Sequence, residues 1–476
     1  MQCQADGMED QAQMHQNANR VTPTPGGVVE VECRDLDRDG KGLASWNNWI
    51  LVIPDLLPGE RAKVQFQQRQ RSRWIARTVE LLSASEHRRK PPCMLAKQCG
   101  GCTLQSLDEI AQTRWKQEML QQTMARVGGI SIDPKPVLDD SARLLGYRNR
   151  ALIPLRRDEN GVLKGGYFRP RSHRIVNMNQ CPVLDPRLDR LIQPIKADLD
   201  ATGWPADHDL HRGGGLRHLG LRVGHHTGDV LITLISSHRN LPGLRALAEQ
   251  WLARWSEVKG VTLNLQPKPS NLIFGTETDC VAGSDTITET FCGLALRLAS
   301  TTFFQVNTPQ AERIVSTLAA WLSSQAFDGH VIDAYSGIGT ISLPLAQSGL
   351  RVVGLELHQS SVDQARISAM QNNLSGRCDF VAGDVLDSLE RHLPGAGAIV
   401  LDPPRRGLDT KVVDLILAEP PPVLAYLSCD PATQARDLKL LLDPNGLYVL
   451  DDCQPVDFFP QTTHLESLAL LKRSKP

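Results

Sequence analysis

The feature that most constrains the fold is an alternation of apolar segments with helix-like segments from about residue 300 onward. Strands are expected at 329–333, 350–356, 396–402 and 423–429, and helices at 340–347 and about 361–372. The apolar runs have the length of buried strands, and strands that alternate with helices form a mostly parallel sheet covered on both faces. The pattern therefore predicts a doubly wound α/β domain.

A glycine-rich turn is expected between the first of these strands and its helix. It reads Asp-Ala-Tyr-Ser-Gly-Ile-Gly-Thr over residues 333–340, and Glu356 ends the next strand, nineteen residues after Gly337. Glycines let the backbone approach a ligand, and a carboxylate at the second strand end can accept from both ribose hydroxyls. A dinucleotide fingerprint requires a third glycine, and Ser342 stands at that position. This departure, together with Asp333, favours S-adenosylmethionine over NAD, with an ordinary tight turn as the alternative.

Two later strands end in residues suited to chemistry. Asp402 opens the run Asp-Pro-Pro-Arg-Arg-Gly, and Cys429 lies within Leu-Ser-Cys-Asp-Pro-Ala-Thr. Ligands of open α/β sheets bind at the carboxyl ends of strands, so both residues are expected at the edge that carries the glycine turn. We expect a lowered thiol pKa for Cys429, because the amide dipoles at a helix start favour the thiolate. The alternatives are a helix cap for Asp402 and a small core residue for Cys429.

The residues near these two motifs add weaker signals. Arg405 and Arg406 follow Asp402 and are suited to contact phosphates. Near the end of the chain, Thr-His-Leu-Glu supplies Glu466, whose carboxylate is a candidate general base. Spacing alone supports the assignment of Glu466 only weakly.

Four cysteines are spaced like the ligands of a metal centre. Cys93, Cys99 and Cys102 form C-x5-C-x2-C, and Cys181 follows much later beside Pro182. Four thiolates suit a tetrahedral zinc or a [4Fe–4S] cluster, and separate structural thiols are the alternative. The chain has eleven cysteines, an odd number, and residues 1–27 lack the apolar core of a signal peptide. We therefore expect a cytoplasmic protein whose thiols stay reduced, preceded by a disordered tail over 1–27.

The formal net charge of -1 conceals two basic segments. Residues 61–90 and residues 143–174 each hold nine Lys and Arg against two acidic residues. Affinity for a phosphate backbone depends on such local charge, so the neutral total does not exclude nucleic-acid binding. Short strands over 28–82 predict a small barrel of the OB type, and the basic stretch beside Trp74 favours RNA binding. No apolar run approaches the roughly 20 residues of a membrane span.

Taken in their order along the chain, the motifs resemble those of the RNA uracil-5 methyltransferase family. Its members are bacterial enzymes that make 5-methyluridine in 23S ribosomal RNA or transfer RNA. The resemblance implies a TRAM domain, the OB-like RNA-binding β-barrel of that family, over 28–83. It also implies a central α+β domain with a [4Fe–4S] site over 84–300. The last domain, 301–476, is implied to be a Rossmann-like methyltransferase domain that uses S-adenosylmethionine.

The resemblance also implies roles for individual residues. The [4Fe–4S] ligands are expected to be Cys93, Cys99, Cys102 and Cys181, which favours iron over zinc. The expected contacts to the cofactor or the target base are Gln305 of the run Phe-Phe-Gln-Val-Asn, Tyr335, Thr340, Glu356, Asp384 and Asp402. Cys429 matches the family nucleophile, which attacks C6 of the uracil, and Glu466 matches the acceptor of the C5 proton.

The expected activity is therefore methylation of C5 of a specific uridine in RNA by a monomeric enzyme that uses S-adenosylmethionine. We expect 23S ribosomal RNA as the target, because a barrel plus a cluster is more typical of the ribosomal-RNA members than of the bacterial transfer-RNA member. Archaeal transfer-RNA enzymes carry both features, so uridine 54 of transfer RNA is the alternative target. The competing functions are a cytosine methyltransferase and a non-catalytic RNA-binding factor for ribosome assembly.

Overall fold

The computed structural model describes residues 22–139, 144–210, 213–442 and 446–474. These residues form two compact units. The first comprises the chain up to Pro92 with residues 102–112 and 461–463, and the second comprises the rest. Most of the tail predicted over 1–27 lies outside the described residues. Its last part is ordered, because Gly26 N donates to Phe66 O at 2.8 Å and Phe66 N donates to Gly27 O at 2.9 Å.

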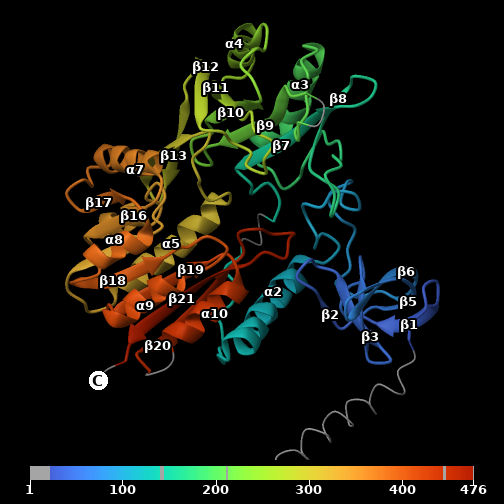
Figure 1. Cartoon of the computed structure of the whole chain (residues 1–476), viewed down its shortest axis with the longest axis horizontal. Coiled ribbons are helices and arrows are strands. Elements are labelled where there is room, and N and C mark those ends of the chain that lie inside the picture. The colour runs from blue at the N-terminus through green and yellow to red at the C-terminus, as the bar shows by residue number, and fades with distance from the viewer. Residues whose placement is uncertain (1–21, 140–143, 211–212, 443–445, 475–476) are drawn as a thin grey trace, which may run out of the picture. The chain divides into compact units, whose positions relative to one another are not determined.

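The first unit contains a six-stranded sheet in the order β1-β5-β6-β4-β3-β2 (Figure 1). Its strands are β1 (Val28–Glu32), β2 (Asp35–Leu36), β3 (Gly42–Trp46), β4 (Trp49–Ile53), β5 (Arg61–Gln70) and β6 (Arg73–Ser83). All neighbours are antiparallel except β4 and β6. In β5 the apolar Ala62, Val64 and Phe66 point to the core. The basic Arg61 and Lys63, which alternate with them along the strand, face away from it. The alternation arises because successive side chains of a strand point to opposite faces.

Trp74, beside the basic stretch that favours RNA binding, lies in the core of the six-stranded sheet. It is only 4% exposed and packs edge-to-face on Phe66, with ring centroids 5.7 Å apart. Because β6 alternates, its basic neighbours Arg73 and Arg77 are exposed while Trp74 is not. The basic stretch is therefore a surface, but Trp74 does not offer a ring to a base there.

The second unit contains two large sheets, and the first of them along the chain has six strands in the order β12-β11-β10-β9-β7-β8. Its elements are β7 (Arg150–Arg157), β8 (Leu163–Gly165), α3 (Pro186–Ala201), β9 (Leu216–Val223), β10 (Val230–Ser236), α4 (Leu244–Arg254), β11 (Val258–Leu265) and β12 (Glu277–Gly283). The helix α2 (Glu109–Thr123), continued by a π-helical turn (Met124–Gly128), precedes this sheet in the chain. The hairpin of β13 (Thr286–Phe291) and β14 (Leu294–Ala299) leads to α5 (Thr308–Ser323) and the last sheet.

The last sheet has seven strands in the order β17-β16-β15-β18-β19-β21-β20 (Figure 1). Its strands are β15 (His330–Ala334), β16 (Val352–Glu356), β17 (Cys378–Ala382), β18 (Ala396–Leu401), β19 (Val423–Ser428), β20 (Tyr448–Val456) and β21 (Glu466–Arg473). Its helices are α6 (Ser342–Gln347), α7 (Gln359–Gln371), α8 (Val385–His392), α9 (Thr410–Ala418) and α10 (Pro431–Leu442). The first five strands are parallel, and β21 is antiparallel to both of its neighbours.

Both faces of this sheet are buried. Val331 of β15 and Ala398 of β18 pack in one apolar cluster. Their chain neighbours Ile332 and Ile399 point to the other face and pack in a second cluster. The prediction of a doubly wound α/β domain with a mostly parallel sheet is therefore confirmed, with the helices starting within a few residues of the expected positions.

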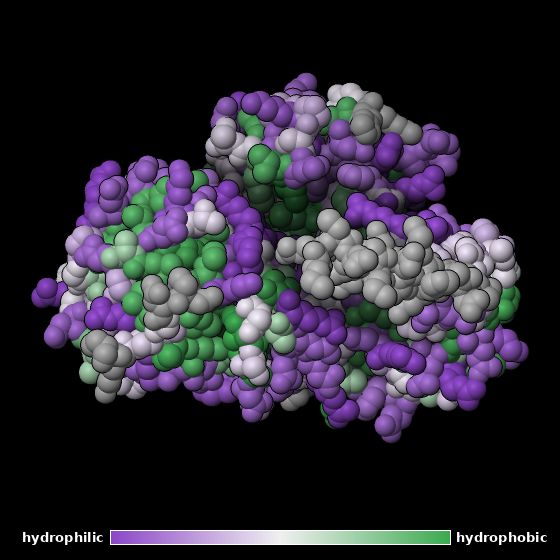
Figure 2. Space-filling model, turned by 60° about the horizontal axis from the view of Figure 1, so that its bottom comes forward, coloured by the Kyte–Doolittle hydropathy of each residue, from purple (hydrophilic) through white to green (hydrophobic). Residues whose placement is uncertain are grey.

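The surface is mixed in polarity. Figure 2 shows one face of the molecule, on which hydrophilic side chains predominate and hydrophobic ones form separate patches. Among the described residues, no helix is both long and apolar enough to cross a bilayer.

Candidate active site

Several strand ends of the last sheet meet at one edge. Ala334, the last residue of β15, pairs with Leu401, the last residue of β18, so that Tyr335 and Asp402 leave the sheet side by side. Ser428 of β19 pairs with Ser467 of the antiparallel β21, so Cys429, which follows Ser428, and Glu466, which precedes Ser467, leave this pair in the same direction. The register therefore brings the residues predicted from four separate motifs to the same edge.

The glycine turn after β15 is shaped around the carboxylate of Glu356. Gly337 N donates to Glu356 Oε2 at 3.1 Å, and His358 N donates to Oε1 at 2.8 Å. Tyr335 and Gly339 both have positive φ, at 68° and 85°, a region that glycine adopts freely and tyrosine rarely does. The turn thus holds the carboxylate at the end of β16 through two backbone amides.

Asp333, at the start of this turn, is a buried carboxyl with one unsatisfied oxygen. Ser342 Oγ donates to Oδ2 at 2.5 Å, and among the described residues no donor reaches Oδ1. Burial raises the pKa of Asp333 to about 7. Burial also raises the pKa of Asp402 to about 7, and the charge of Asp333 adds to that shift. A buried oxygen without a partner is costly, so Oδ1 is suited to accept from a ligand.

Cys429 and Glu466 are electrostatically linked. Burial raises the pKa of the Cys429 thiol to about 11, and the charges of Glu466 and Asp402 add to this shift. Burial raises the pKa of Glu466, which is 5% exposed, to about 8, and Asp402 again adds to the shift. The positive charge of Arg405 lowers both values.

The expected lowering of the thiol pKa by the helix start is therefore wrong. Asp430 takes the amide donors at the beginning of α10, with Ala432 N donating to its Oδ1 at 2.8 Å and Thr433 N at 3.4 Å. The amides that would have stabilised a thiolate are engaged by a carboxylate, and desolvation then dominates. Asp430 was not singled out from the sequence, although an Asp just before a helix is a recognised capping signal.

The other residues predicted to contact the cofactor differ in exposure. Asp384 is exposed and caps α8, accepting from Leu386 N at 2.9 Å, and its charge acts on the phenol of Tyr335. Gln305 and Thr340 are half-buried. The backbone oxygen of Gln305 accepts from Asn149 Nδ2 at 2.9 Å, which fixes the segment before α5. Phe303 in this segment is 68% exposed, so its ring is accessible to a ligand.

The four cysteines of the predicted metal centre are all half-buried, and none of the ten described cysteines forms a disulfide. Gly101 N donates to Cys99 Sγ at 3.4 Å. Burial raises the pKa of the Cys99 thiol, and the charge of Cys93 adds to the shift. Gly100 N also donates to Phe168 O at 2.9 Å, which holds the loop that contains Cys99. A thiol with a backbone amide aimed at its sulfur fits metal ligation.

Residues 388–474, which include Cys429 and Glu466, match the model of the tRNA (uracil-5-)-methyltransferase family. The chain is also 61% identical over 456 residues to an uncharacterized RNA methyltransferase of Parasynechococcus marenigrum, covering 96% of this chain and 98% of the relative. The chain belongs to the RNA uracil-5 methyltransferase family. A second relative, an uncharacterized RNA methyltransferase of Synechocystis, is 40% identical over 447 residues, covering 94% of this chain and 96% of the relative.

A solved structure supports the same assignment for this methyltransferase. The Pyrococcus abyssi tRNA (uracil-54, C5)-methyltransferase in complex with S-adenosyl-L-homocysteine matches with a TM-score of 0.73 and 25% sequence identity. The match covers 93% of this chain and 99% of that one. The solved structure therefore agrees with the family that the relatives show for this chain.

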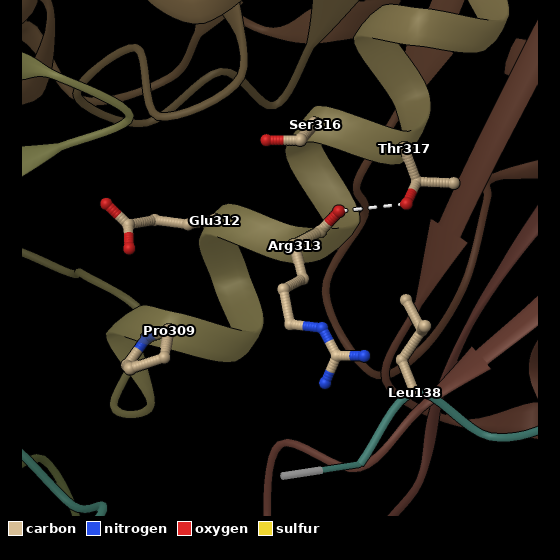
Figure 3. A pocket seen from close by; sticks show the side chains of 6 residues that line it. All are labelled: Leu138, Pro309, Glu312, Arg313, Ser316 and Thr317. Carbon is tan, nitrogen blue, oxygen red and sulfur yellow. Dashed lines mark hydrogen bonds between the residues drawn. The ribbon is translucent and has the colours of Figure 1, made fainter.

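Figure 3 shows a cavity on α5. That cavity has a volume of about 470 Å³ and is lined by Leu138, Pro309, Glu312, Arg313, Ser316 and Thr317. None of the predicted site residues lines it. The residues predicted for the chemistry lie instead at the sheet edge, where the charges of Glu466 and Asp402 add to the effect of burial in raising the pKa of Cys429.

Proposed function

We propose that this methyltransferase methylates C5 of a uridine in RNA through a covalent bond between Cys429 Sγ and C6 of the base. The observation that carries the proposal is the adjacency of Cys429 and Glu466 in the β19–β21 register. A nucleophile and a proton acceptor at neighbouring positions suit a reaction in which one group attacks C6 and the other takes the proton from C5.

The glycine turn supplies the residues to hold S-adenosylmethionine. Glu356, held by two amides, would accept from the ribose hydroxyls, and Asp333 Oδ1 would accept a further donor. Gln305, Tyr335, Thr340, Asp384 and Asp402 would complete the proposed pocket for the cofactor or the target base. When bound, the cofactor supplies a methyl group on a positively charged sulfur.

The residues of the chain carry the remaining steps. Cys429 gives up its proton to solvent, and the thiolate forms the Sγ–C6 bond while the C5–C6 π electrons move toward C5 and make that carbon nucleophilic. Once C5 is methylated, Glu466 removes the C5 proton. The electron pair of the C–H bond restores the C5–C6 double bond, and the Sγ–C6 bond breaks to release Cys429. Arg405 supports both groups, because its charge favours the thiolate and the carboxylate.

We infer that Cys93, Cys99, Cys102 and Cys181 hold a [4Fe–4S] cluster. The reduced thiols and the amide aimed at Cys99 Sγ fit such a group. When bound, the cluster supplies a covalent link between the loop that contains Cys93 and the segment that precedes α3. Zinc is the other metal that four thiolates accept.

The proposed substrate is an RNA whose target uridine is flipped out of its stack into the pocket. Residues 28–83 would act as a TRAM domain, residues 84–300 as the cluster domain and residues 301–476 as the catalytic domain. Exposed basic side chains of β5 and β6 support RNA contact in the first of these. We propose 23S ribosomal RNA as the target, and the likeness to a transfer-RNA uracil-54 enzyme favours transfer RNA as the second candidate.

Nucleoside mass spectrometry tests the proposal. Ribosomal and transfer RNA from a strain that lacks the gene are incubated separately with the protein and S-adenosylmethionine, and the modified position is mapped. We expect 5-methyluridine from the wild type and none from Cys429→Ala, which should still bind RNA. A methylated cytosine, an RNA that is bound but never methylated, or turnover by Cys429→Ala would each contradict the proposal.

A further inference from the structure

Lys116 and Asp457 form a fully buried ion pair within the second unit. Lys116 Nζ lies 2.7 Å from Asp457 Oδ1, and the two side chains are 0% and 2% exposed. Burial lowers the pKa of Lys116 and raises that of Asp457, while each charge opposes the shift of the other. Buried ion pairs seldom add net stability over apolar side chains of similar size, so such a pair calls for a geometric role.

The pair lies beside Glu466 in the sheet. Val456, the last residue of β20, is the register partner of Glu466, and Asp457 follows it directly. Asp457 N donates to Leu138 O at 2.8 Å, and Asp457 Oδ1 also accepts from Phe459 N at 3.0 Å. Asp457 therefore fixes the point at which the chain leaves β20, across from the first residue of β21.

The connection that leads from Asp457 to Glu466 is also held by neighbouring side chains. Three buried donors from different parts of the chain reach three consecutive carbonyls of this connection. Asn307 Nδ2 donates to Phe458 O at 3.3 Å, Lys116 Nζ to Phe459 O at 3.2 Å and Tyr147 OH to Pro460 O at 3.2 Å. A loop has few hydrogen bonds of its own to fix it, so these side chains hold the first part of the connection.

We propose that Lys116 and Asp457 are positioning residues that hold Glu466 against Cys429 for removal of the C5 proton. The inference rests on the proposed function, in which Glu466 accepts that proton. Without the pair, the start of β21 can shift, and a displacement of about 1 Å slows a proton transfer strongly. Attack by Cys429 comes from β19 and does not depend on the connection. Loss of the pair therefore slows the step that releases the RNA adduct more than the step that forms it.

A second ion pair on β20 provides the matched control. Lys135 pairs with Asp452, and Lys135 N donates to Cys453 O at 3.0 Å. This pair joins the segment after α2 to the same strand, but the Lys135 side chain is 52% exposed and Asp452 stands opposite Leu470, four residues into β21. Lys135→Met thus removes an ion pair from β20 without touching the connection to Glu466.

The experiment follows the covalent adduct in single turnovers of the full-length protein with its RNA substrate and S-adenosylmethionine. Denaturing gels report adduct formation and adduct decay, and mass spectrometry reports 5-methyluridine. The test variant is the double substitution Lys116→Met with Asp457→Leu, which leaves no unpaired buried charge. Asp457→Asn is the second variant, because Lys116 can shed its proton when the partner charge is removed.

We expect both variants to form the adduct at nearly the wild-type rate and to resolve it about tenfold more slowly or worse. Lys135→Met should resolve it as fast as the wild type. Thermal unfolding shows which of the two test variants folds. If a folded variant resolves the RNA adduct at the wild-type rate, the positioning role is overturned. Absence of any adduct and any 5-methyluridine with the wild type would instead overturn the proposed function on which this inference rests.

Discussion

Asp402 and Glu466 are coupled carboxyl groups at the edge of the last sheet. The charge of Asp402 adds to burial in raising the pKa of Glu466 to about 8, and it also contributes to the raised pKa of Cys429. Glu466 and Cys429 therefore both prefer their neutral forms near pH 7. Arg405 is the positive charge that opposes this preference, so its removal should have a measurable effect on the chemistry.

Replacing Glu466 by Gln should trap the RNA on the protein. The amide retains the size of the side chain but cannot accept the C5 proton, so the Sγ–C6 bond forms and does not break. A shifted band on a denaturing gel, dependent on S-adenosylmethionine and absent in the double variant with Cys429→Ala, measures the effect. Free RNA alone, under conditions in which the wild type is active, would contradict the role of Glu466.

Replacing Arg405 by Gln should shift the pH dependence of methylation upward. Glu466 must be ionised to accept a proton, so the wild-type rate should rise with pH through about 8. Loss of the positive charge raises the pKa of both Glu466 and Cys429, and the rising limb moves to higher pH. Single-turnover rates between about pH 6.5 and 9.5 measure the midpoint.

Arg406→Gln is the control for this prediction, because the Arg406 charge acts on Tyr335. The Arg406 variant should keep the wild-type midpoint. Coincident pH profiles for the wild type and Arg405→Gln would show that Arg405 does not tune the site.

Asp402→Asn should make folding stability less dependent on pH. Asp402 and Glu466 have pKa values raised from 3.8 and 4.5 to about 7 and about 8. At pH values between the unshifted and the raised pKa of each group, the folded protein binds more protons than the unfolded chain. The free energy of unfolding therefore falls as pH rises through this range. The substitution removes one such group and lowers the pKa of the other. The melting temperature should therefore fall less between pH 5 and pH 8.5 than in the wild type, by differential scanning fluorimetry, and a steeper fall would refute the coupling.

Cys99→Ser should remove the proposed cluster. Anaerobically purified wild type is expected to carry about four iron atoms per chain, and the variant close to none, because a hydroxyl replaces a thiolate ligand. Iron and sulfide assays measure the loss. Cys280→Ser, which changes an exposed cysteine outside the predicted set, should retain the wild-type iron content. Wild-type protein that contains zinc and no iron would show that the four thiols bind zinc and not the proposed cluster.

Much of the site was predictable because it lies where strands end. Asp333, Asp402 and Cys429 each follow an apolar run, and the carboxyl ends of parallel strands meet at one edge. Local pattern was therefore sufficient to bring them together. Glu466 was only weakly supported by spacing, because it starts a strand, and the antiparallel direction of β21 that brings it to the same edge is a property of the sheet.

Ionisation was not predictable from the same motifs. The helix start after Cys429 suggested a lowered thiol pKa, but burial and two neighbouring carboxylates raise it, and Asp430 engages the amides. Burial likewise decides the environment of Trp74, which is in the core although basic residues flank it in the sequence. Desolvation depends on every group that packs around a side chain, and a short motif records only its chain neighbours.

By itself the sequence determined the element types, the α/β class and the edge at which the predicted site residues gather, because hydrophobic periodicity and turn residues act over a few positions. Only the tertiary structure decided which charges meet. Lys116 and Asp457 are 341 positions apart, and Cys429 and Glu466 become neighbours through strand pairing. Contacts between distant segments follow from how the whole chain packs, and it is these contacts that set the burial, pKa and alignment of the groups on which the proposed chemistry depends.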